Sequence, residues 1–200
     1  MQAICKWFFI LIIFTSLPVF ALEKGGISYD GIDYSKLNAS KIRTEADAFW
    51  DKYEQTNDLA FLTTATAKYY VLTKINPLDI YSIVQLAKSY GELGNYKYAK
   101  SYFNRAISID KNDPYTNYYY AEFYFKRNNY RKALRYYMIA YDSSYSNNEN
   151  LNIKIATIYE KFADLHKAKY YYERAYSINS SSGYSKDKII QLQSILGESK

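Results

Sequence analysis

Residues 80–113 read IYSIVQLAKSYGELGNYKYAKSYFNRAISIDKND, and residues 114–147 repeat their pattern as PYTNYYYAEFYFKRNNYRKALRYYMIAYDSSYSN. Four series of residues recur: Ala87, Ala121 and Ala156; Tyr90, Tyr124 and Tyr159; Ala99, Ala133 and Ala168; Ala106, Ala140 and Ala175. In every series the first step is 34 residues and the second is 35, which places a one-residue insertion near Asn147-Asn148. A fixed period of this length indicates a repeat architecture, in which each unit buries its apolar face only against its neighbours.

The order of residues within one unit predicts a hairpin of two helices. In residues 80–90 the apolar side chains fall three to four apart, which puts them on one helical face. Gly94-Asn95 then supplies turn chemistry, and residues 96–109 form a second face with the same spacing. We expect the two helices to approach closely at three small residues, Ala87, Ala99 and Ala106, because larger side chains there would push the helix axes apart.

These positions make the chain resemble the tetratricopeptide repeat family. That family's unit carries a small residue and a tyrosine in its first helix, then alanine, an aromatic residue and alanine in its second. Three consecutive units match: Ala87, Tyr90, Ala99, Phe103 and Ala106; Ala121, Tyr124, Ala133, Tyr137 and Ala140; Ala156, Tyr159, Ala168, Tyr172 and Ala175. The resemblance implies an all-α fold, an α-solenoid of antiparallel helix pairs, with repeats at 80–113, 114–147 and 149–182.

A degenerate copy is predicted at residues 46–79. Ala65 and Tyr69 stand 34 residues before Ala99 and Phe103, whereas Leu72 replaces the last alanine of the motif. Terminal repeats are commonly atypical because one of their faces meets solvent.

Local chemistry predicts where several helices begin. Thr44 with Asp47 three residues later resembles a capping box for the first helix. Asp113 can cap a helix that starts with Pro114, and Asp79 can cap the helix that starts at Ile80.

The end of the chain predicts one more helix. After Gly183, apolar residues at helical spacing indicate an amphipathic capping helix at 184–197 that shields the last repeat, with Gly197 as its stop.

The first residues have the layout of a secretory signal peptide. A short positive segment is followed by an apolar run from Trp7 to Leu17 and by Ala21, after which cleavage is expected, so residues 1–21 form the signal. An uncleaved membrane anchor is the alternative, although the apolar stretch is short for a span of about 20 residues. Residues 22–43, with Gly25, Gly26 and Gly31, are predicted to be a flexible lead.

Composition supports export and says little about charge-driven binding. The only cysteine, Cys5, lies in the signal segment, so a cleaved chain would have no disulfide in an oxidising compartment. The abundance of Lys, Asn, Ile and Tyr resembles proteins of low-GC bacteria, which makes the periplasm or the outside of the cell the expected destination. The formal net charge of +6 favours acidic partners only weakly.

The sequence offers little for catalysis. His166 is the only histidine, and we expect it in an exposed turn without the nucleophile and carboxylate that a catalytic triad needs. Zinc ligands of the usual Cys/His kind and a Gly-rich phosphate loop are lacking. We therefore predict a protein that is not an enzyme and that takes no cofactor or metal.

The resemblance implies a groove lined by the first helix of each unit, which commonly binds an extended or helical peptide. The family's groove positions correspond to Trp50 and Glu54 in the degenerate copy. In the later units they correspond to Tyr81, Val84, Lys88, Tyr115, Tyr118, Glu122, Phe125, Ile153, Thr157 and Lys161. The Lys–Asn arrangement that grips a terminal carboxylate in some members is lacking, since Val84 and Lys88 precede Tyr118 and Glu122. The groove is instead aromatic, and tyrosine gives a large contact area with a polar tip.

The sequence thus predicts an exported, non-catalytic adaptor that binds a protein or peptide partner in the bacterial envelope. A secreted effector that acts on a host protein is an alternative. A helical-repeat RNA reader that stacks bases on tyrosines is another, against which the signal segment argues.

Overall fold

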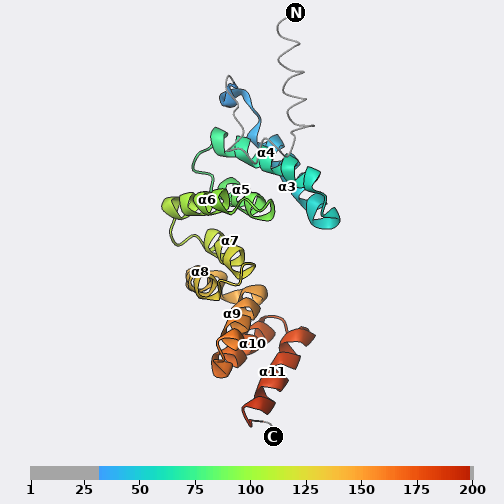
Figure 1. Cartoon of the computed structure of the whole chain (residues 1–200), viewed down its shortest axis with the longest axis vertical. Helices are drawn as coiled ribbons and strands as arrows, with labels where there is room; N and C mark the ends of the chain where they lie inside the picture. Colours follow the sequence, from blue (N-terminus) through green and yellow to red (C-terminus); the bar gives the residue numbers. More distant parts are fainter. Residues whose placement is uncertain (1–31, 199–200) are drawn as a thin grey trace, which may run out of the picture. The chain divides into compact units, whose positions relative to one another are not determined.

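The computed structural model describes residues 32–198, and within them it contains nine α-helices arranged in antiparallel pairs (Figure 1). The chain divides into two compact units, with the boundary between Ile109 and Asp110. The predicted signal peptide at 1–21 and the first part of the predicted lead, residues 22–31, lie outside the described residues. In residues 32–198 no helix has the length and apolar character that a membrane crossing requires.

The first unit consists of two helix pairs that follow a 3-10 turn at Tyr34–Lys36. The first pair is α3 (Ala39–Thr56) with α4 (Leu59–Ile75), and the second is α5 (Ile80–Glu92) with α6 (Tyr96–Ile109). Helix α4 packs against both α3 and α5, so it carries more buried residues than any other helix of this unit. The degenerate copy is therefore a genuine helix pair.

The second unit consists of two further pairs and a closing helix. Its elements are α7 (Pro114–Phe125), α8 (Tyr130–Ser143), a 3-10 turn at Tyr145–Asn147, α9 (Glu149–Lys161), α10 (Leu165–Ile178) and α11 (Gly183–Ile195). The 3-10 turn lies where the repeat period lengthens from 34 to 35 residues, so it accommodates the extra residue.

The repeated alanines are buried within the packed helix pairs. All of them have no exposed surface: Ala87, Ala99, Ala106, Ala121, Ala133, Ala140, Ala156, Ala168 and Ala175. The aromatic residues that follow on the second helices, Phe103, Tyr137 and Tyr172, are buried beside them. The two helices of each hairpin pack against one another, as predicted.

The first helix starts earlier than predicted. Helix α3 begins at Ala39, because the side chain of Asn38 accepts a hydrogen bond from the backbone N–H of Lys41 at 3.0 Å. Thr44 instead donates its hydroxyl to the carbonyl of Ser40, and Asp47 faces other helices. The predicted capping box is therefore wrong, and residues 39–43, which were predicted to belong to the lead, are the start of this helix.

The two other predicted caps differ from one another. The carboxylate of Asp113 accepts a hydrogen bond from the backbone N–H of Thr116 at 2.7 Å, with Pro114 at the first helical position, as predicted. Asp79 precedes α5 without such a bond, since its carboxylate pairs with Arg43 of α3 and accepts from the hydroxyl of Ser82. Asp79 therefore connects two helices in place of capping one.

Helix α11 covers the last repeat with only one stripe of its surface. Leu192 is buried, whereas Ile190 and Ile195 remain 55% and 60% exposed. The helix ends before Gly197, whose φ of 70° closes it in the left-handed conformation that glycine adopts readily. The predicted stop is confirmed, and the predicted shielding is partial.

The turn inside each helix pair contains a residue with positive φ. Asn57, Gly94 and Asn128 occupy this place in the first three pairs, and Ala163, with φ of 58°, occupies it in the fourth. Glycine and asparagine tolerate the left-handed region, whereas an alanine there is strained by contact between its Cβ and the backbone.

We therefore expect Ala163→Gly to raise the free energy of unfolding by about 0.5–1 kcal/mol, since relief of strain exceeds the extra flexibility of the unfolded chain. The matched control is Ala48→Gly at an exposed position inside α3, which should lower it by about 1 kcal/mol. Urea unfolding followed by circular dichroism measures both, and a loss of stability in Ala163→Gly would contradict the strain.

Candidate functional site

The first helices of successive pairs contact one another on one side of each unit, which we call the first-helix face of that unit. In the first unit, the Nζ atom of Lys88 on α5 lies 4.4 Å from the ring centre of Trp50 on α3. In the second unit, Lys154 on α9 pairs with Glu122 on α7, and Lys188 on α11 pairs with Glu160 on α9. These faces carry the predicted groove residues.

The predicted groove residues differ in accessibility. Most of them are partly exposed: Tyr81, Lys88, Tyr115, Tyr118, Glu122, Phe125, Ile153 and Thr157; Lys161 and Glu54 are exposed. Trp50 is 7% exposed, and Val84 is fully buried. Val84 therefore offers no surface to a partner, because α5 packs against both α4 and α6 and little of its circumference remains open.

A carboxylate at the centre of the first unit's face joins three helices. Oδ1 of Asp47 on α3 accepts hydrogen bonds from the hydroxyls of Tyr69 on α4, at 2.7 Å, and Tyr81 on α5, at 2.9 Å. Gln85 donates to the Tyr81 hydroxyl at 2.9 Å, and Arg43 lies over the Tyr81 ring. Tyr81 is thus held in place by polar contacts on both sides.

The second unit builds a related arrangement around Glu122. The hydroxyl of Tyr137 on α8 donates to Oε1 of Glu122 on α7. The Nζ atom of Lys154 on α9 lies 3.5 Å from Oε2 of the same carboxylate and 4.5 Å from the ring centre of Phe125. Tyr118 packs beside this group, with its ring 5.9 Å from that of Tyr137.

A third arrangement closes the second unit around Glu160. The hydroxyl of Tyr172 on α10 donates to Oε2 of Glu160 at 2.6 Å, and Lys188 on α11 lies 3.0 Å from Oε1. Thr157 lies 3.3 Å from the Tyr172 hydroxyl. Helix α11 thus contributes a cation to the last pair as a following repeat would.

These three arrangements form a recurring tyrosine–carboxylate network, which the sequence reasoning missed. Tyr69, Tyr137 and Tyr172 occupy the position that Phe103 holds in the repeat at 80–113, and each donates to a carboxylate of its own first helix. A side chain of the next first helix then reaches the same carboxylate. The presence of tyrosine at this buried position could have predicted the network, because the hydroxyl of a buried tyrosine needs a polar partner.

Burial raises the pKa values of three tyrosines at the second unit's face. Burial, and then the negative charge of Glu122, raise the pKa values of Tyr118 and Tyr137 above the usual value. Burial and the hydrogen bond to Glu160 act on the pKa of Tyr172 in the same direction. The phenols therefore remain hydrogen-bond donors across the physiological range.

The single histidine of the chain lies on a second helix, α10. His166 is exposed on the first turn of α10, where Nδ1 lies 3.8 Å from a carboxylate oxygen of Glu198. Across residues 32–198, no three histidine, cysteine or acidic side chains gather as metal ligands. What the faces present is a set of aromatic rings held in place by ion pairs, which suits contact with another polypeptide.

Comparison with known families places this architecture. The tetratricopeptide repeat model matches residues 80–113 and 150–182, and the described chain has the tetratricopeptide-repeat fold. The predicted fold class is confirmed, and two segments of the chain match the tetratricopeptide repeat model itself. Curated protein sequences give no match.

Solved structures agree on the fold. Pseudomonas aeruginosa pilF is 15% identical, with a TM-score of 0.67 over 80% of this chain and 71% of pilF. A structure of MamA is 18% identical, with a TM-score of 0.61 over 74% of this chain and 84% of MamA. YrrB, described as a TPR protein with an unusual peptide-binding site, is 14% identical, with a TM-score of 0.60 over 82% of this chain and 80% of YrrB.

The tyrosine–carboxylate network predicts strong coupling between Tyr137 and Glu122. Tyr137→Phe should lower the free energy of unfolding by about 1.5–3 kcal/mol, because the lost hydrogen bond ends on a charged group. In a double-mutant cycle with Glu122→Gln, we expect an interaction energy of at least about 0.5 kcal/mol. Chemical denaturation of the four proteins measures this interaction energy.

The control is Tyr130→Phe, because the hydroxyl of Tyr130 donates a hydrogen bond to exposed Asn128. This control should change the free energy of unfolding by less than about 0.5 kcal/mol. Additive effects at Tyr137 and Glu122 would contradict the network.

Proposed function

We propose that this protein is a non-catalytic adaptor, which binds a protein or peptide partner on the first-helix face of its second unit. Tetratricopeptide repeat proteins typically mediate protein–protein interactions. The observation that carries the proposal is the set of partly exposed aromatic side chains on α7, Tyr115, Tyr118 and Phe125, of which Tyr118 and Phe125 pack against buried Tyr137.

Preorganisation supports this reading. Rigid aromatic side chains lose little conformational freedom on binding, and tyrosine and tryptophan are enriched among the residues that dominate interface energies. Around Tyr118 and Phe125, the ion pair between Glu122 and Lys154 holds the neighbouring helices together before a partner arrives. The described structure of YrrB gives a precedent for peptide binding on this fold.

The test compares two double variants in pull-downs from envelope extract. Tyr115→Ala with Lys161→Ala removes one aromatic and one charged side chain of the proposed face without touching the network. Tyr170→Ala with Lys186→Ala removes the same two residue types from exposed positions on α10 and α11. We expect the first variant to retain at least about tenfold less partner than the wild type does. The second variant should retain as much partner as the wild type.

Circular dichroism at 222 nm confirms that both variants keep their helix content. Equal retention by a folded Tyr115→Ala/Lys161→Ala variant and by the wild type would show that this face is not the binding surface.

The compartment belongs to the same proposal. The layout of residues 1–21 supports export to the periplasm or the medium, with a membrane-anchored form if the segment is kept. The mass of the protein recovered from each cell fraction tests this. A mature chain that begins at Leu22 is expected in the periplasm or medium, and a full-length chain in the cytoplasm would contradict export.

A further inference from the structure

The second unit carries a strongly basic segment outside its first-helix face. Residues 126–135 read KRNNYRKALR, which is five cations and no acid in ten residues. The corresponding segments of the neighbouring repeats, ELGNYKYAKS at 92–101 and KFADLHKAKY at 161–170, each contain an acid and fewer cations. The repeat architecture therefore does not require this charge.

The structure places these cations around the turn between α7 and α8. Lys126, Arg131, Lys132 and Arg135 are exposed. Arg131, Lys132 and Arg135 lie within the first two turns of α8. None of these three side chains forms an ion pair with a described residue. Arg127 is committed internally, because it donates to the carbonyl of Phe123 at 2.6 Å and lies 3.8 Å from the ring centre of Phe123.

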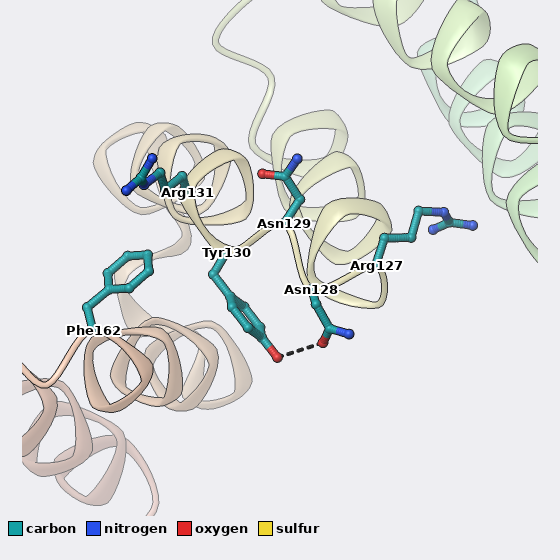
Figure 2. Close-up of a pocket in the computed structure, with 6 residues that line it drawn as sticks. All are labelled: Arg127, Asn128, Asn129, Tyr130, Arg131 and Phe162. Carbon is teal, nitrogen blue, oxygen red and sulfur yellow. Dashed lines mark hydrogen bonds between the residues drawn. The ribbon is translucent and has the colours of Figure 1, made fainter.

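An open hollow of about 410 Å³ lies at this turn. It is lined by Arg127, Asn128, Asn129, Tyr130 and Arg131 of the α7–α8 turn, and by Phe162 at the end of α9. Figure 2 shows Tyr130 between Phe162 and Asn128, with the guanidinium of Arg127 directed away from Tyr130. Phe162 is 43% exposed, so the hollow offers an aromatic wall to solvent.

The charges of the hollow have one sign. Its lining contains two arginines, two asparagines and two aromatic residues, without an acid. The acids nearest to Phe162 in the sequence are Glu160 and Asp164. The carboxylate of Asp164 caps α10 and lies 2.8 Å from Nζ of Lys167, and that of Glu160 lies 3.0 Å from Nζ of Lys188. Both carboxylates are thus paired with lysines, and the field at the hollow is set by Arg131 and its neighbours.

We infer that this hollow, together with the basic segment 126–135, is a second docking site that takes an acidic segment of a partner protein. An apolar side chain of the segment enters between Tyr130 and Phe162, and its carboxylates meet Arg131 and Arg135. Complementary charge raises the association rate and fixes the orientation of the bound segment. The aromatic contact buries the segment's apolar side chain.

The shape of the site favours a peptide over an anionic membrane surface. A flat anionic surface would meet Arg131, Lys132 and Arg135 but would leave the hollow unfilled. Asn128 accepts the Tyr130 hydroxyl through Oδ1 at 2.7 Å, which leaves its amide N–H groups available as donors for peptide carbonyls. A peptide that enters the hollow would contact both the amide N–H groups of Asn128 and the aromatic wall, whereas a flat surface would contact neither.

The site lies at the α7–α8 turn and shares no residue with the proposed first-helix face, although its Tyr130 packs against Phe125 of that face, with ring centres 5.5 Å apart. The variants that test the site therefore leave Tyr130 unchanged. Loss of binding at one surface is therefore measurable while the other is intact, and the two proposals fail separately.

The test titrates the full chain with a fluorescently labelled hexapeptide in which five glutamates surround one phenylalanine. We expect saturable binding that weakens as salt is raised. Arg131→Glu with Arg135→Glu should weaken it at least about tenfold, and both glutamates suit the N-terminal half of a helix. Phe162→Ala should weaken it as well, and so should alanine in place of the peptide's phenylalanine.

The matched control is Lys97→Glu with Lys100→Glu, which changes the net charge equally at exposed positions on α6, Lys97 being the equivalent of Arg131. This control should bind like wild type. Equal weakening in both double variants, or no effect of the phenylalanine, would overturn the site in favour of unspecific charge attraction. Binding to phosphatidylglycerol vesicles that is lost in Arg131→Glu/Arg135→Glu, with no binding of the hexapeptide, would overturn it in favour of a membrane surface.

Discussion

Contact between paired helices through alanine side chains is the constraint on which the rest of this structure depends. Alanine at three positions of each full repeat lets the two helix backbones approach, and none of these methyl groups has exposed surface. Close approach leaves the larger aromatic residues to fill the space between successive pairs. Because the same three positions recur at steps of 34 and 35 residues, each full repeat builds its helix pair in the same way.

Within each unit, hydrogen bonds and ion pairs join neighbouring helix pairs, whereas the repeated alanines lie inside each pair. Tyr69, Tyr137 and Tyr172 are buried up to their hydroxyls, and each hydroxyl reaches a carboxylate near the unit's surface. A buried hydroxyl without a partner would cost free energy, so the carboxylates on the first helices are required by the tyrosines on the second. The next first helix supplies a lysine or a tyrosine hydroxyl and thereby fixes the spacing of neighbouring pairs.

Within the second unit, the two surfaces of interest differ in physical character. The first-helix face combines aromatic rings with charges that already pair internally, so its attraction for a partner comes mainly from burial of rings. The turn between α7 and α8 carries cations that are exposed, with a hollow beside them. The first surface suits a rigid, largely apolar contact, and the second suits charge-driven capture.

The sequence by itself determined the helix pairs, their alanine contacts, the turn at the inserted residue and the cap at Asp113, because each depends on residues close together in the chain. The tertiary structure alone decided that Val84 is buried, that Asp47 and Asp79 serve other helices, and that Glu122 and Glu160 receive tyrosine hydroxyls. Periodicity assigns a residue to one face of its own helix, whereas burial and polar pairing depend on which side chains neighbouring helices bring to that face.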